Sequence, residues 1–172
     1  MDDQRTDAAG TIVVGFDGSP HGEAALRYAL AEGARRGMPV NVVTASEPPE
    51  SWAYAYSVYP LLDSGEAREA MQAASTRRVE EIRDGLDDAQ RAVPVEVTTI
   101  VGPPSVVLTE SAKGAALLVV GHRGRGGLRS ALLGSAGLSA VLHAPCPVTV
   151  VPAYTVAEEQ IARAVDAAAV AP

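Results

Sequence analysis

Short apolar runs alternate with longer segments of helical spacing along most of this chain. The runs are residues 11–16, 40–45, 95–101, 115–120 and 148–151, and valine dominates them. Continuous apolar runs of this length are typical of strands that are buried on both faces of a parallel sheet. The alternation predicts the order β-α-β-α-β-α-β-α-β-α.

Residues that favour helix ends mark several of the predicted helices. Ser19 is a good N-cap and Pro20 suits the first helical position, so a helix is expected from Pro20 to about Arg36, where Gly37 ends it. The other helices are expected at about residues 64–89, 105–113, 135–143 and 155–169. Right-handed crossovers make the expected fold class α/β: a doubly wound five-stranded parallel sheet with helices on both faces.

The chain of 172 residues has the length of one domain. We expect a flexible tail at 1–10, one domain at 11–152 and an Ala-rich helical extension at 153–172. No apolar run approaches the roughly 20 residues that span a bilayer, and the polar N-terminus does not resemble a signal peptide. These observations predict a cytoplasmic protein with no membrane partner.

Acidic and basic residues are unevenly distributed. The formal net charge is −7, which argues against nucleic acid as a partner, yet residues 111–157 contain no acid and four basic residues, Lys113, Arg123, Arg125 and Arg129. A basic region on an acidic protein suggests a specific anionic ligand. Cys146 is the only cysteine, which excludes an intramolecular disulfide, and we expect it to pack as a small hydrophobic residue.

A glycine-rich segment carries the clearest chemical signal. It reads VVGHRGRGGLRSALLGSAG, follows a predicted strand and leads into a predicted helix. Glycine allows backbone N–H groups to approach phosphate oxygens, and a helix that opens at Gly134-Ser135 favours an anion at its N-terminus. The alternative is a flexible connector. The GxxxxGK[ST] phosphate motif is absent, and the spacing that remains is Gly121-x2-Gly124-x9-Gly134-Ser135.

With that spacing the chain resembles the universal stress protein family, in its ATP-binding branch. The resemblance covers roughly residues 11–152 and rests on several segments in the family's order. They are VVGFDGS at 13–19, VVTASE at 42–47, VGPPSVVL at 101–108, VVGHRGRGGLRSALLGS at 119–135 and VLHAPCPVTVV at 141–151. The resemblance implies a Rossmann-like sheet of order 3-2-1-4-5, in which ligands bind where the order reverses. Gly137 stands where the family usually has a bulkier residue, and we expect it to loosen the helix start.

The resemblance also implies an adenine-nucleotide site. The nucleoside would lie against Asp17, with Gly15 and Phe16 before it, against backbone groups of Thr44, and beside Gly102. The ribose and phosphates would be held by the glycine-rich segment. Its implied contacts are Gly121, His122, Arg123, Gly124, Gly134, Ser135 and Ala136.

Individual residues in this set have structural alternatives. Asp17 also suits a turn beside Ser19. The His122 side chain is expected to face solvent, and His21 and His143 have no sequence partner that suggests a metal site. Four aromatic residues, Trp52, Tyr54, Tyr56 and Tyr59, are interpreted either as a packed flap or as a lid or partner surface.

The resulting expectation is an ATP-binding stress-response regulator that is not an enzyme. ATP would bring Mg²⁺ held by its phosphates and Ser135. Three alternatives stay open: a member that binds cyclic AMP or AMP, a slow ATPase, and a nucleotide-free dimerisation module. The apolar fifth strand predicts a homodimer through that edge.

Overall fold

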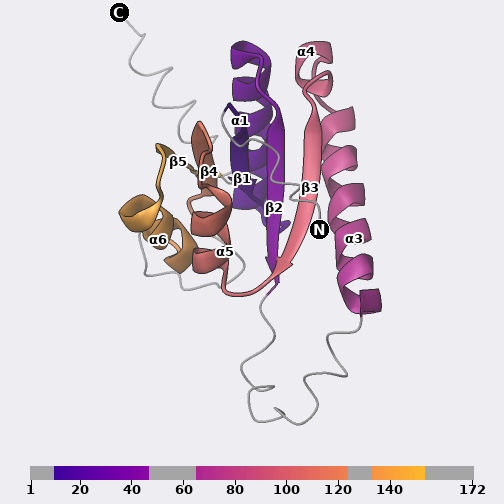
Figure 1. Cartoon of the computed structure of the whole chain (residues 1–172). Helices are drawn as coiled ribbons and strands as arrows, with labels where there is room; N and C mark the ends of the chain where they lie inside the picture. Colours follow the sequence, from indigo (N-terminus) through magenta and orange to yellow (C-terminus); the bar gives the residue numbers. More distant parts are fainter. Residues whose placement is uncertain (1–9, 47–64, 124–132, 154–172) are drawn as a thin grey trace, which may run out of the picture.

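The computed structural model describes residues 10–46, 65–123 and 133–153 (Figure 1). Its five strands are β1 (Ile12–Gly15), β2 (Val40–Ser46), β3 (Val95–Val101), β4 (Leu117–Gly121) and β5 (Val148–Val151). They form one parallel sheet of order β3-β2-β1-β4-β5, which confirms the predicted fold class and strand order. The predictions for residues 1–9, the aromatic segment, Gly124 and residues 154–172 lie outside the described residues.

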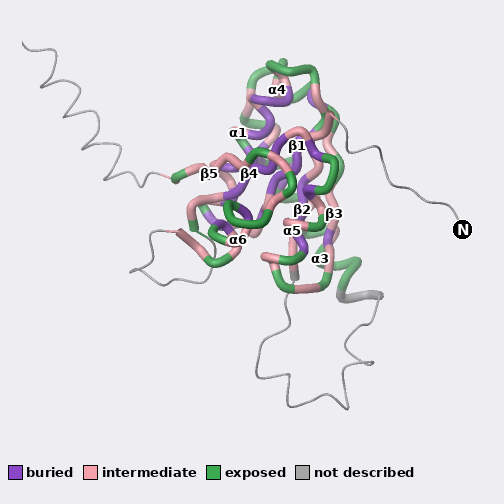
Figure 2. The backbone as a smooth tube through the Cα atoms, turned by 60° about the vertical axis from the view of Figure 1, so that its left-hand side comes forward, coloured by how far each residue is buried: buried purple, intermediate pink, exposed green. Residues whose placement is uncertain are grey.

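Helices cover both faces of the sheet. The described helices are α1 (Pro20–Arg36), α3 (Gly65–Asp84), α4 (Asp88–Arg91), α5 (Pro104–Ser111) and α6 (Ser135–His143). One face packs Val14 and Val42 against α1 and α3, and the other packs Val13 and Val43 against α5 and α6. Figure 2 shows the buried central strands between these layers. Both faces of β1 are therefore closed to solvent, and ligands can reach the sheet only at its ends or edges.

The first helix has the predicted ends. Ser19 Oγ accepts a hydrogen bond of 3.1 Å from the N–H of Gly22, and Pro20 occupies the first turn. Gly37 ends the helix in the left-handed conformation with φ 66°, which glycine adopts without a steric cost. Local sequence signals fix α1 at both ends.

The predicted helix at 64–89 is wrong at its C-terminus. α3 ends at Asp84, and a separate short helix, α4, begins after Asp87, whose side chain accepts from the N–H of Gln90 at 2.9 Å. Gly85 lies in the break between them. Glycine lowers helix stability and aspartate provides a new N-cap, so two helices replace one.

The two edge strands, β3 and β5, differ in whether their outward backbone groups are hydrogen-bonded. At β3 the outward carbonyl of Val97 accepts a hydrogen bond from the Gln72 side chain of α3, and the Arg83 guanidinium donates to Val93 O at 3.2 Å. At β5, Pro147 O and Val151 O accept bonds from the β4 side, so the backbone groups of Val148 and Val150 point outward. No bond to those outward groups occurs in the described part of the chain.

Candidate nucleotide site

The carboxyl ends of β1 and β4 form the floor of the candidate site. These strands are neighbours in the sheet, and the chain leaves them toward opposite edges, because β2 flanks β1 and β5 flanks β4. A Cβ atom on Gly121 would lie only 2.7 Å from both atoms of the backbone carbonyl group of His21. The first turn of α1 therefore rests directly on the end of β4. The sequence-predicted Asp17 turn and the Gly121–Arg123 segment meet here.

Asp17 forms the turn that precedes α1. Its Oδ1 accepts a hydrogen bond of 2.9 Å from the N–H of Ser19, which is the structural alternative that the sequence left open. Gly22 is required beside it, because a Cβ there would lie 2.5 Å from Asp17 Oδ1. The carboxylate is half-buried and held at a fixed position at the carboxyl end of the sheet.

The glycine-rich segment leaves β4 and returns to it. The N–H of Gly134 donates to the carbonyl oxygen of His122 at 3.0 Å, and Gly134 O accepts from Leu138 N–H at 2.8 Å, within α6. Gly134 is the N-cap of α6, with no side-chain hydrogen bond and no acid in the first turn. The first-turn N–H groups, which include those of the exposed Ser135 and of Ala136, receive no capping side chain from the described residues. Such a helix start attracts an anion.

At the end of β2, the backbone groups that point to the β1 side belong to Ala45. Val40 N–H donates to Pro94 O on the β3 side, whereas Val43 O accepts from Phe16 N–H on the β1 side. Backbone groups alternate sides along a strand, so those of Thr44 point toward β3 and those of Ala45 toward the space beyond the end of β1. The sequence interpretation that chose Thr44 missed this residue. The Thr44 hydroxyl is buried without a hydrogen-bond partner.

Three other predicted contacts have structural roles. A Cβ on Gly15 would lie 2.9 Å from Leu108 Cδ1, so this glycine admits α5. The Phe16 side chain is 4% exposed and belongs to the core, which leaves only its backbone for contact with a ligand at the end of β1. Gly102 follows β3 with φ 153°, a conformation that favours glycine, and it lies at the same end of the sheet but two strands away from β1.

His122 and Arg123 follow directly after the carboxyl end of β4. The His122 N–H donates to Val151 O at 2.8 Å, and its ring is stacked with the ring of His21, with 6.2 Å between the ring centroids. The His122 side chain is partly exposed and also contacts a second imidazole, which the sequence did not predict. Arg123 is exposed, as a residue that meets a phosphate from solvent would be.

Gly137 lies in a closely packed place at the start of α6. It is buried, and a Cβ there would lie 3.0 Å from Leu133 Cδ1. The absence of a side chain lets the residues before the helix pack against its first turn. A bulkier residue at this position would therefore require Leu133 to shift.

Cys146 has the character of a structural residue. Its side chain is partly buried and packs against the core of the α5–α6 face. Burial raises the pKa of the Cys146 thiol, which keeps the group in its weakly nucleophilic protonated form. Among residues 10–46, 65–123 and 133–153, no three histidine, cysteine or acidic side chains gather as metal ligands would.

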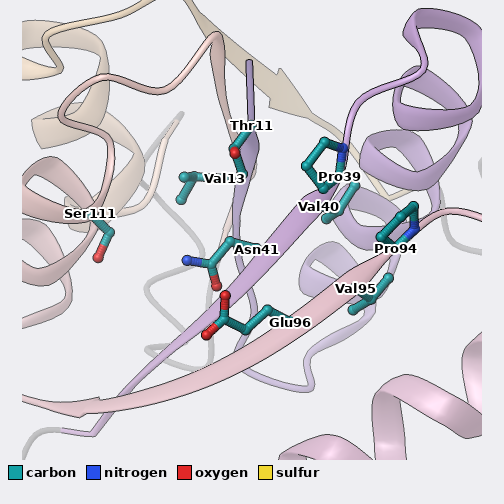
Figure 3. A pocket seen from close by; sticks show the side chains of 9 residues that line it. All are labelled: Thr11, Val13, Pro39, Val40, Asn41, Pro94, Val95, Glu96 and Ser111. Carbon is teal, nitrogen blue, oxygen red and sulfur yellow. The ribbon is translucent and has the colours of Figure 1, made fainter. Parts of the chain in front are cut away.

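The opposite end of the sheet contains a shallow cleft of about 240 Å³ (Figure 3). It lies at the amino ends of β1, β2 and β3, and Val13 and Val40 are among its lining residues. Its polar lining includes Asn41, whose side-chain oxygen accepts from the Thr98 hydroxyl at 3.3 Å, and the carboxylate of Glu96. A negatively charged mouth disfavours phosphate, so the cleft is a poorer nucleotide site than the carboxyl end.

Comparison with known proteins identifies the family. The family model described as the universal stress protein family matches residues 9–152. The chain belongs to this family. A curated universal stress protein, Rv1996 of Mycobacterium tuberculosis, is 33% identical over 150 residues, covering 82% of this chain and 47% of its own length. The chain thus spans about half the length of such curated relatives.

Solved universal stress proteins have the same fold. UspA from Lactobacillus plantarum is 20% identical with a TM-score of 0.59, covering 83% of this chain and 97% of its own. A universal stress protein solved in complex with cAMP is 25% identical with a TM-score of 0.56, covering 85% of this chain and 98% of its own. Among the described residues of the present universal stress protein, no helix is long and apolar enough to cross a membrane.

Proposed function

We propose that this universal stress protein binds an adenine nucleotide, foremost ATP, at the carboxyl ends of β1 and β4. The observation that carries the proposal is the uncapped start of α6, which the hydrogen bond from Gly134 N–H to His122 O brings back to the end of β4. The phosphates would lie at Gly134, Ser135 and Ala136, with Mg²⁺ held by the phosphates and the Ser135 hydroxyl. The nucleoside would lie toward Asp17 and the backbone groups of Ala45.

The site supports binding and regulation better than phosphoryl transfer. Phosphoryl transfer requires a group that orients the nucleophile and cations that stabilise the transferred phosphate. Among the described residues between β1 and α1 and directly after β4, Asp17 is the only carboxylate, and it accepts a hydrogen bond from Ser19 N–H. The protein would therefore act by changing its interactions when the nucleotide binds, with ATP hydrolysis slow or absent.

Calorimetry on Gly134→Val tests the proposal. Gly134 has φ −64° and ψ 155°, which valine adopts without strain, so the sheet should remain intact. The added side chain would occupy the space where phosphate meets backbone, and ATP binding should be lost. Gly85→Val is the matched control, because a Cβ at Gly85 meets nothing nearer than Ile82 O at 3.7 Å. Normal ATP binding by Gly134→Val would show that the segment is only a connector.

A second candidate ligand is cyclic AMP. The complex of a universal stress protein with cAMP, 25% identical to this chain, favours it. Competition between ATP, AMP and cyclic AMP in the same calorimeter ranks the three. Mass spectrometry of ligand released from denatured protein identifies what the protein carries from the cell, and a nucleotide-free preparation without any ATP-dependent thermal shift would favour a dimerisation module.

The outward backbone groups of β5 support a homodimer through this edge. Val148 and Val150 direct N–H and C=O groups away from β4, and α6 beside them exposes Leu138, Val141 and Leu142. Unpaired strand edges next to apolar surface favour strand addition. Val150→Pro removes one outward N–H without breaking a bond to β4, and light scattering should then report a monomer where the wild type is a dimer.

A further inference from the structure

We propose that the cleft at the amino ends of β1, β2 and β3 is a second ligand site, which takes a small organic amine as its ammonium ion. The cleft has a volume of about 240 Å³ and lies at the opposite end of the sheet from the proposed nucleotide site. Pockets for drug-sized ligands typically have about 300–1,000 Å³, so the occupant of this cleft must be smaller. The proposal does not depend on nucleotide binding.

Two neighbouring strands place an acid and an amide side by side in the lining of the cleft. Asn41 of β2 and Glu96 of β3 are paired in the sheet register, so their side chains leave the same face. Figure 3 shows the Asn41 amide and the Glu96 carboxylate pointing toward one another. The Asn41 side-chain oxygen accepts from the Thr98 hydroxyl at 3.3 Å and has a second lone pair for a ligand donor. The lining therefore presents hydrogen-bond acceptors, one of them charged.

Among the residues that the structure describes, no cation pairs with the Glu96 carboxylate, which is exposed. The basic side chains at this end of the sheet are engaged with acids three or four residues away along the chain. These pairs include Arg36 with Glu32, Arg91 with Asp88, and Lys113 with Glu110. The charge of Glu96 is therefore left to attract a cation from solution.

The C-terminus of α5 adds to the negative potential in the cleft. This helix ends at Ser111, which lines the cleft, and its last turn contains no basic residue. The carbonyl end of a helix favours a positive charge. A calcium ion would need six or more oxygen ligands, whereas Glu96 is the only carboxylate of the lining. The lining therefore fits an organic cation better than a metal ion.

Apolar groups beside these acceptors match the carbon chain of an amine. Val13 and Val40 are buried side chains of the lining, and Pro39 and Pro94 are its exposed apolar members. An ammonium group has three donors and no acceptor, which complements a carboxylate beside an amide oxygen. A short alkylamine would direct its ammonium group to Glu96 and bury its chain against the valines.

NMR titration of the full chain with butylamine tests the proposal, with butanol and butyrate as probes of the same chain length. At neutral pH, butylamine should cause saturable shifts of the amide signals of Asn41, Glu96 and Ser111. Butanol lacks the charge and should bind about tenfold more weakly or less, and butyrate should leave these signals unchanged. Nα-acetyl-lysine N-methylamide should also bind more weakly than butylamine. Tighter binding of this probe would assign the cleft to a lysine side chain of a partner protein and overturn the proposal.

Two charge variants decide whether the cleft itself holds the amine. Glu96→Gln should weaken butylamine binding by about tenfold or more, because the charged acceptor is lost. Glu69→Gln is the matched control, since it removes the same charge from an exposed position on α3 and should retain the wild-type affinity. Equal losses in both variants, or equal binding of butanol and butylamine, would overturn the ammonium site. ATP affinity should be the same in Glu96→Gln and the wild type, so failure here leaves the nucleotide site standing.

Discussion

The N-termini of α1 and α6 lie at the same end of the sheet but are treated in opposite ways. At α1, Ser19 caps the helix, Pro20 needs no hydrogen bond and Glu23 places an acid in the first turn. At α6, the N-cap is Gly134, the helix lacks a capping side chain and the first turn has no acid. The first helix start is satisfied by the protein's own groups, whereas the second receives no capping side chain from the described residues, which is where the phosphates are proposed to bind. This difference explains why the phosphates are proposed to bind at the start of α6 and not at the start of α1.

The largest effect is expected when a side chain that caps α6 is introduced, because this removes the difference between the two helix starts. Gly134→Asp would place a carboxylate where the phosphates are proposed to bind, and ATP affinity should fall by roughly a hundredfold or more, equivalent to two charge-assisted hydrogen bonds. The same change should stabilise the free protein by about 0.5 kcal/mol through capping and the helix dipole. Calorimetry and thermal melting measure the two effects. Gly134→Asn, an uncharged cap, should weaken ATP less, and unchanged ATP affinity in Gly134→Asp would contradict the proposed site.

Removing the hydroxyl from the start of α6 tests how much Ser135 contributes to phosphate binding. Ser135→Ala should weaken ATP binding by about 1.5–3 kcal/mol, the range for one hydrogen bond to a charged group. Adenosine affinity should stay within about twofold, because the proposed contact is to phosphate. Titration of both ligands into the same variant gives the answer, and equal losses for ATP and adenosine would place Ser135 away from the phosphates.

Removing the cap of α1 should lower the stability of the fold and leave ATP affinity nearly unchanged. Ser19→Ala removes the cap from a helix whose first turn rests on Gly121, and it should lower the free energy of unfolding by about 1 kcal/mol. ATP affinity of the folded variant should change by less than about threefold. Urea unfolding followed by circular dichroism measures the stability. A large loss of ATP affinity with little loss of stability would mean that α1 also binds the ligand directly through Ser19.

The smallest effect is expected at Glu23. Glu23→Gln removes the first-turn acid of α1 and its pairing with Arg78, whose pKa is raised chiefly by the hydrogen bond to Glu23. The loss of unfolding free energy should be roughly half of that for Ser19→Ala and should shrink in high salt, as expected for a partly exposed charge. Melting curves at low and high salt test this, and a salt-independent loss would point to packing.

Sequence patterns predicted the parts of this fold that depend on neighbours along the chain. Apolar runs located all five strands, and Ser19, Pro20 and Gly37 fixed α1. The break between α3 and α4 was missed because Gly85 alone does not end a helix, and the new cap at Asp87 had to be recognised with it.

The site was predictable only in part, because its geometry depends on strand register. Gly134 and Ser135 followed from glycine spacing, and the closure of Gly134 onto His122 agrees with that interpretation. Choosing Ala45 over Thr44 requires knowing which side of β2 bonds to β3. The meeting of His21 with His122 requires the adjacency of β1 and β4, since the two residues are far apart in the sequence.

The unequal edges of the sheet limit how many copies of this protein can add to one another. Gln72 occupies an outward carbonyl of β3 and Arg83 occupies the carbonyl of Val93 just before it, so that edge offers a poorer template for another strand. If β5 of one copy pairs with β5 of a second, the open edge of each is used up and the assembly is closed by a twofold axis. A domain with two receptive edges would instead polymerise. The side chains that bond to the β3 edge would thus limit an assembly formed through β5 to two copies.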